Sequence, residues 1–169
     1  MKSRMISKRQ LFTNRKLIQE LEMQFELVEN NSSNWTKTYL DTETKNQWLC
    51  FYVETEYHGG GNPIFGKLPL PQTNDLINIA LTSEFEDEVF AACKMLTEKE
   101  KIENIDFRKE LIDKLETLKD KNRRIKIIDF TALDFAINRQ VTMGKTFDQI
   151  GLDFKVYKEI SERATRLKK

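Results

Sequence analysis

His58 is the one histidine of the chain, and it lies in the glycine-containing segment 57–61. An imidazole beside flexible backbone can act as a general base, and Glu54 and Glu56 are close enough in sequence to orient its ring. Neither cysteine lies in a motif that would place a thiol nucleophile against it. We therefore interpret His58 as a structural or surface histidine, and a small hydrolase that uses it is the less favoured alternative.

A phosphate-binding loop is only partly matched. Residues 61–67 have the spacing of a Walker A loop up to its lysine, but Leu68 replaces the hydroxyl residue that would hold magnesium. Pro69 and Pro71 follow where an uninterrupted helix must begin. We therefore do not expect nucleotide hydrolysis.

The possible metal ligands are also better explained as structural residues. Glu86, Asp87 and Glu88 are consecutive acids at an expected helix start, where carboxylates complement the helix dipole. Cys50 and Cys93 are too few for a disulfide framework or a zinc site, and we interpret them as reduced thiols. The sequence therefore predicts no metal and no cofactor.

The elements that position these residues begin with an amphipathic helix over 13–28, which the turn-forming residues 30–34 would end. Residues 35–40 and 47–54 are rich in aromatic and β-branched side chains and predict a β-hairpin. We expect its two tryptophans, Trp35 and Trp48, to be substantially buried.

Residues 57–71 contain all three prolines and four of the six glycines, which predicts an irregular loop. Helical periodicity continues from Thr73 nearly to the end, with Thr73 or Asn74 as the first cap. Of the expected later helices, the first starts at a Ser83/Glu86 capping box and the second near Asn104 or Asp106. The third starts near Arg124, where a strand over 125–130 is the alternative. The last starts at a Thr146/Gln149 capping box and is expected to break or bend at Gly151.

These elements predict an α+β fold, mainly helical, around one core. We expect a single domain over 1–169, in which 35–71 form the hairpin and loop and 73–169 form the helical part, with about five helices. No apolar run approaches the ~18 residues that span a bilayer, and the first ten residues lack the apolar stretch of a secretion signal. The expected location is the cytoplasm, without a membrane partner.

Charge is unevenly distributed along a chain whose net charge is only +1. Residues 73–120 carry thirteen acids and seven bases, and residues 121–169 carry twelve bases and six acids. Near-neutrality argues against a dedicated nucleic-acid binder. The basic patch at 121–126, made by Lys121, Arg123, Arg124 and Lys126, is better explained by solvated or helix-pairing side chains than by phosphate contacts.

Short motifs follow one another between residues 35 and 120: Trp35 and Trp48, then Tyr57-His58-Gly59-Gly60, Leu68-Pro69-Leu70-Pro71, Leu76-Ile77 and Asp87-Glu88. Their order resembles small bacterial immunity proteins that accompany polymorphic or contact-dependent growth-inhibition toxins. The resemblance implies a protein that is not an enzyme and that binds and neutralises a cognate toxin in the producing cell. A helical adaptor or regulatory subunit for another protein is the alternative.

If the toxin is a nuclease with a basic cleft, an acidic helical face would complement its charge and accelerate association. Together with the resemblance, the acidic middle of the chain gives Glu84, Glu86, Asp87 and Glu88 as toxin-binding candidates, with Glu98, Glu100 and Glu103 nearby. Tyr57 and His58 on the glycine loop are candidate contact anchors, since aromatic groups are common at interface centres.

Overall fold

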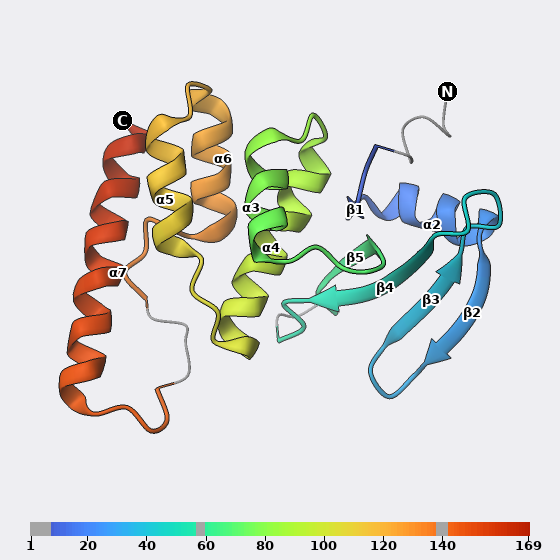
Figure 1. Ribbon diagram of the computed structural model, residues 1–169, viewed down its shortest axis with the longest axis horizontal. Helices are drawn as coiled ribbons and strands as arrows, with labels where there is room; N and C mark the ends of the chain where they lie inside the picture. Colours follow the sequence, from blue (N-terminus) through green and yellow to red (C-terminus); the bar gives the residue numbers. More distant parts are fainter. Residues whose placement is uncertain (1–7, 57–59, 138–141) are drawn as a thin grey trace. The chain divides into compact units, whose positions relative to one another are not determined.

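The computed structural model describes residues 8–56, 60–137 and 142–169, and Figure 1 labels its elements along the chain. Its backbone contacts form two compact units, Met1–Ala92 and Cys93–Lys169, which are described separately. The boundary between them lies within helix α4 (Glu86–Glu103). The described ranges contain six helices and a five-stranded antiparallel sheet, so the predicted mixed α+β class is confirmed.

The sheet belongs to the N-terminal unit, and its strand order is β1-β5-β4-β3-β2. The hairpin predicted from the aromatic segments is confirmed as β3 paired with β4. The strands are β1 (Leu11–Phe12), β2 (Glu26–Asn31), β3 (Thr36–Leu40), β4 (Gln47–Val53) and β5 (Asn62–Lys67).

Strand β2 corrects the predicted N-terminal helix. Helix α2 (Arg15–Gln24) starts at Asn14, whose side chain accepts hydrogen bonds from the Lys16 and Leu17 N–H groups, and it ends at Phe25. The chain then extends as β2 and pairs antiparallel with β3. The helical period of the sequence continues past residue 24, but pairing with a neighbouring strand overrides that local preference.

Strand β5 corrects the predicted irregular loop over 57–71. Pro63 is tolerated because β1 reaches only Phe65 and Gly66, so no neighbour on that side requires the missing N–H. Gly66 suits close packing, since a Cβ built there would lie 2.6 Å from Cδ2 of Leu70, whose side chain would have to move. The two residues that made this segment look irregular therefore have specific positions inside a sheet.

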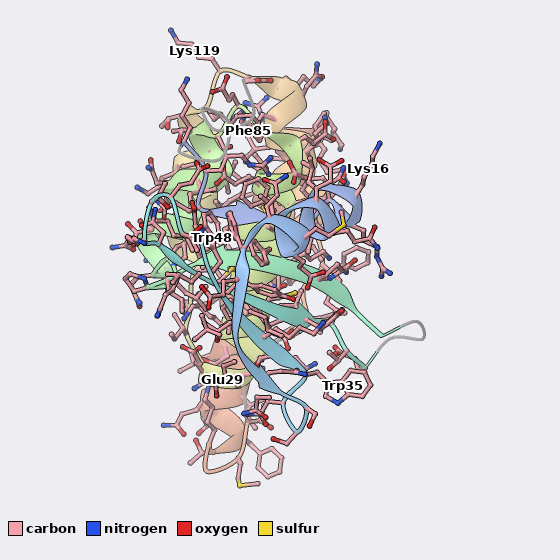
Figure 2. The ribbon with its side chains drawn as sticks, turned by 90° about the vertical axis from the view of Figure 1, so that its right-hand side faces the viewer. Lys16, Glu29, Trp35, Trp48, Phe85 and Lys119 are labelled. Carbon is pink, nitrogen blue, oxygen red and sulfur yellow. The ribbon has the colours of Figure 1, made fainter. Side chains whose placement is uncertain are left out.

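One face of the sheet packs against α2 in an aromatic core. Trp48 is 1% exposed and stacks on Phe65 with ring centroids 5.5 Å apart, so its predicted burial is confirmed. Trp35 is 77% exposed, so the same prediction for it is wrong. It lies in the turn before β3, and Figure 2 shows its ring at the outer end of the sheet, away from Trp48. The buried cluster consists of Phe12, Ile18, Leu21, Tyr39, Trp48, Cys50 and Phe65.

Helix α3 (Thr73–Thr82) completes the N-terminal unit together with the first turns of α4. The predicted cap at Thr73 or Asn74 is wrong by one residue, because Gln72 and Asp75 form the capping box. Ser83 accepts a hydrogen bond from the Phe85 N–H at 3.1 Å just before α4 begins. Leu76, Ile77 and Val89 are buried on these helices, as their spacing predicts.

The C-terminal unit is helical. It contains the rest of α4 and the helices α5 (Arg108–Thr117), α6 (Lys121–Thr131) and α7 (Phe147–Lys168). The capping box of Thr146 and Gln149 is confirmed, and the expected break at Gly151 is wrong because α7 continues through it. A helix rather than the alternative strand covers 125–130. The five helices α3 to α7 agree with the predicted number.

Candidate protein-binding surface

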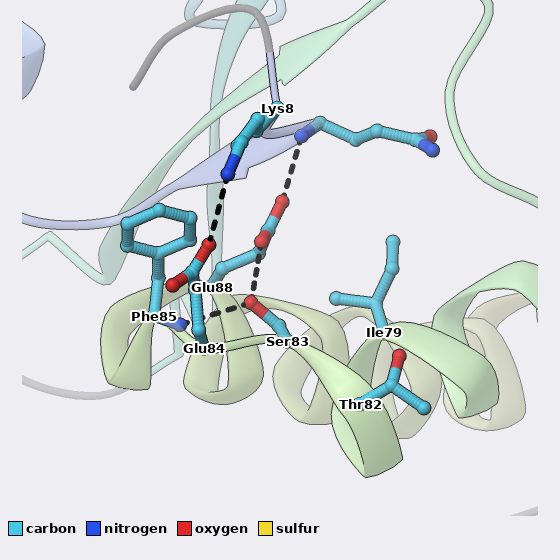
Figure 3. Close-up of a pocket in the computed structure, with 8 residues that line it drawn as sticks. Lys8, Ile79, Thr82, Ser83, Glu84, Phe85 and Glu88 are labelled. Carbon is cyan, nitrogen blue, oxygen red and sulfur yellow. Dashed lines mark hydrogen bonds and ion pairs between the residues drawn. The ribbon is translucent and has the colours of Figure 1, made fainter. Parts of the chain in front are cut away.

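Glu88, a predicted toxin-binding residue, is buried inside the N-terminal unit. Its Oε1 accepts hydrogen bonds from the backbone N–H groups of Gln10 at 2.7 Å and Leu11 at 3.1 Å. Its Oε2 accepts one from the Ser83 hydroxyl at 2.6 Å, and Figure 3 shows this contact between Glu88 and Ser83. Since the side chain is 4% exposed, this carboxylate holds the N-terminal strand and presents no charge to a partner.

Asp87 also contacts the N-terminal segment. Its Oδ2 lies 2.6 Å from Nη2 of Arg9, a residue that is 2% exposed. The guanidinium of Arg9 also lies over the rings of Phe12 and Phe85, at 4.0 Å and 4.6 Å from their centroids. Asp87 therefore balances a buried cation, which is a structural use of its charge.

Glu84 and Glu86 remain exposed at the start of α4. The Glu84 carboxylate lies 3.8 Å from Nζ of Lys8, and both side chains are largely in water, where such a pair is weak. A hollow of about 520 Å³ lies beside them (Figure 3). Its lining consists of Lys8, Gln10, Ile79, Thr82, Ser83, Glu84, Phe85 and Glu88.

The remaining predicted anchors, Tyr57 and His58, lie outside the described residues. Their neighbours in sequence, Thr55 and Gly60, are described, and both line a second hollow of about 470 Å³. The other residues that line it are Ser33, Asn34, Trp35, Thr36, Phe51 and Tyr52.

Trp35 is 77% exposed beside this second hollow and has an unusual backbone. Its φ of 56° lies in the left-handed region, which costs a bulky residue about 1–2 kcal/mol. The side chain of Asn31 holds the turn, because its Oδ1 accepts hydrogen bonds from the Ser33 hydroxyl at 2.6 Å and from the Ser33 and Asn34 N–H groups. A large ring is thus held in water by a strained, well-bonded turn, an arrangement found at functional sites.

In the C-terminal unit, the acid nearest the predicted face is also internal. Glu100 is 0% exposed, and its Oε1 accepts hydrogen bonds from Nε of Arg108 at 2.7 Å and from the Tyr157 hydroxyl at 2.9 Å. Burial, and then the Glu100 carboxylate, raise the pKa of Tyr157 well above its usual range. Arg108 also donates to the Ala132 carbonyl at the end of α6, so the ion pair and its hydrogen bonds join α4, α5, α6 and α7.

The other predicted charges of this unit have partners close by. Lys99 lies 3.3 Å from the Glu103 carboxylate, one helical turn away. In the basic patch, Arg124 donates to the Leu118 carbonyl at 3.0 Å and Lys121 donates to the Lys169 carbonyl at 2.8 Å. These two cations thus pair with helix ends, as we expected for the patch.

The cysteines give no sign of a reactive thiol. Both are buried, and burial raises the pKa of Cys50 to about 11 and that of Cys93 to about 12. At neutral pH both groups therefore hold their protons. Within the described ranges, no three His, Cys, Asp or Glu side chains are grouped so that they could hold a metal ion.

Comparison with known proteins finds no match: no protein-family model fits the chain, and no curated protein or solved structure is similar to it. None of the helices in the described ranges combines the length and the apolar character that crossing a membrane requires.

Proposed function

We propose that this protein binds and neutralises a cognate protein toxin, as an immunity protein of a polymorphic or contact-dependent growth-inhibition system. Binding takes place in the cytoplasm of the producing cell, and the toxin is a nuclease. The resemblance of residues 35–120 supports the family. The geometry supports action by binding.

The observation that carries this proposal is the exposure of Trp35 beside a hollow. Tryptophan is among the residues that contribute most to protein interfaces, and anchors of this kind are surrounded by polar groups that exclude water on binding. Trp35 has such surroundings, because Asn34, Thr36 and Thr55 line the same hollow as the rings of Phe51 and Tyr52. An indole held in water at a cost in backbone energy is best explained by a partner that covers it.

The burial of Glu88 and the pairing of half-buried Asp87 with Arg9 change the acidic face that we expected. Of the four carboxylates, Glu84 and Glu86 are the ones with exposed side chains. They accelerate association with a basic toxin surface, and Trp35 supplies contact area after the encounter. In this proposal Asp87 and Glu88 support the fold of the binding unit.

The test is co-expression with the product of the gene directly upstream, followed by a pull-down and a growth assay. Trp35→Ala should weaken the complex about 30-fold or more, since hot-spot truncations cost about 2 kcal/mol or more. Phe147→Ala is the matched control, because Phe147 is 94% exposed in the C-terminal unit and lies away from this hollow in sequence.

Two results would overturn the proposal. The first is failure of the wild-type chain to protect cells from the upstream gene product. The second is turnover of a small-molecule substrate that is lost in His58→Ala, which would identify a hydrolase.

A further inference from the structure

The two edges of the sheet are covered to very different extents. At β1, the N–H groups of Gln10 and Leu11 are bonded to Glu88, so carboxylates of α4 cover the backbone of this edge. At β2, the outermost strand on the other side, no hydrogen bond among the described residues reaches the outer backbone edge. Such an edge is a template for another strand.

A bulge in β2 determines on which face of the sheet each side chain of the strand lies. The register shifts between Leu27 and Glu29, so that Glu26 lies opposite Leu40 and Glu29 lies opposite Thr38. Because directly opposed residues share a face, both glutamates are on one face of the sheet, and Leu27, opposite Tyr39, is on the other. The bulge thus places both glutamates on one face of the open edge and Leu27 with Asn30 on the other.

Neither of these glutamates is neutralised within the described ranges. Glu26 and Glu29 are exposed and form no ion pair with a described residue. Lys37, the basic residue of β3, lies on the opposite face and is 4.0 Å from the Glu22 carboxylate. The residues of β3 and β4 that share the face of the two glutamates carry no charge: Thr36, Thr38, Leu40, Gln47, Leu49, Phe51 and Val53.

A second copy of this chain is a poor occupant of the edge. If two β2 strands paired antiparallel so that Leu27 lay opposite Val28, each Glu26 would lie opposite the other chain's Glu29. Like charges directly opposite each other destabilise strand pairing. Self-pairing in this register is therefore disfavoured, whereas basic side chains at alternate positions of a partner strand would neutralise both carboxylates.

We propose that the outer edge of β2 binds an extended basic segment of the toxin, which adds a sixth strand to the sheet. The segment has lysine or arginine at alternate positions toward Glu26 and Glu29 and apolar residues toward Leu27. Its backbone bonds to β2 supply affinity, and the alternating side chains supply specificity. The turn that carries Trp35 follows β2 directly in the chain. This inference rests on the proposed function only in that the toxin is the protein that supplies the added strand.

The first experiment uses a synthetic peptide in which lysine and valine alternate, and a control peptide with glutamate in place of lysine. Amide hydrogen exchange is measured along the whole chain. The lysine peptide should slow exchange in 26–31 by about tenfold or more and leave β5 unchanged, because only the open edge gains backbone bonds. The glutamate peptide should have no effect.

Matched variants test the role of charge. Glu26→Gln/Glu29→Gln should abolish the protection by the lysine peptide, and Glu43→Gln/Glu162→Gln, two exposed acids elsewhere, should preserve it. A lysine peptide that leaves residues 26–31 unprotected overturns the inference. So does concentration-dependent dimerisation of the free chain with protection of the same residues, because a second copy would then occupy the edge.

The same measurement on the toxin complex separates the inference from the proposed function. Protection of 26–31 in that complex supports both. Neutralisation of the toxin without protection of β2 overturns the edge as its docking site and leaves the function standing. If the lysine peptide protects β2 but no toxin is bound, the edge stands as a basic-strand site and the function falls.

Discussion

The β1 edge and the β2 edge of the same sheet use acidic residues in opposite ways. At β1, Asp87 and Glu88 are taken out of water to bind Arg9 and the backbone of the N-terminal strand. At β2, Glu26 and Glu29 stay in water without an ion pair to a described residue. Acidic density along a sequence therefore does not by itself locate an acidic surface, because within one run of acids Glu84 and Glu86 are exposed while Glu88 is buried.

The largest expected effect on stability distinguishes the buried aromatic core of the sheet from the exposed turn before β3. Trp48→Ala should lower the free energy of unfolding by about 4 kcal/mol, because it removes a buried indole that packs on Phe12 and Phe65. Trp35→Ala should change it by less than about 0.5 kcal/mol, because its ring lies in water. Urea unfolding of both variants measures the difference. Similar losses would show that Trp35 is packed in solution.

The second prediction compares a carboxylate from each edge. Asp87→Ala should cost about 3 kcal/mol, because it leaves the buried guanidinium of Arg9 without its counter-ion. Glu29→Ala should be nearly neutral in the same urea titration. Arg9→Met/Asp87→Ala should recover part of the loss, since both charges are then absent. If Asp87→Ala leaves the free energy of unfolding unchanged, the carboxylate of Asp87 does not stabilise the β1 edge.

These comparisons also show what the sequence could predict. Periodicity indicated the helices from α3 onward, because apolar stripes are local signals, although the predicted cap of α3 and the predicted break at Gly151 were wrong. Strands β2 and β5 were missed because their formation depends on neighbours distant in sequence: β2 pairs with β3, and β5 holds Pro63 and Gly66 between β1 and β4.

The binding residues were predictable only in part, for a related reason. Composition identifies Glu84 to Glu88 as an acidic run, but whether each carboxylate faces water depends on the approach of Arg9 and Gln10, which are more than seventy residues away. The exposure of Trp35 was missed because its type suggests burial. The turn-formers before it were the one local signal that it leaves the strand.

The third prediction concerns the pH dependence of stability and whether water reaches the aromatic core between the sheet and α2. Burial raises the pKa of Cys50 to about 11, so the unfolded chain loses this proton at a lower pH than the folded chain. The stabilisation is therefore complete below the ordinary thiol pKa and is lost as pH rises toward 11, by at most about 1.4 kcal/mol for each pH unit.

The measurement is urea unfolding between pH 8 and pH 10 in a Cys93→Ala background, which removes the second buried thiol. Replacing Cys50 by alanine in that background should flatten the alkaline decline. An unchanged slope would mean that Cys50 ionises as readily in the folded chain as in the unfolded one, and that water reaches the core.

The smallest expected effect on stability concerns the backbone conformation of Trp35. Its left-handed φ suits glycine, whereas alanine at the same position keeps the strain. Trp35→Gly should therefore be about 0.5–1 kcal/mol more stable than Trp35→Ala in thermal or urea unfolding, while both variants lose the indole and bind the toxin equally weakly. Equal free energies of unfolding would show that the turn relaxes in solution and that its backbone is not strained. Restored binding in Trp35→Gly would be a sharper contradiction, because the turn rather than the ring would then be what the partner recognises.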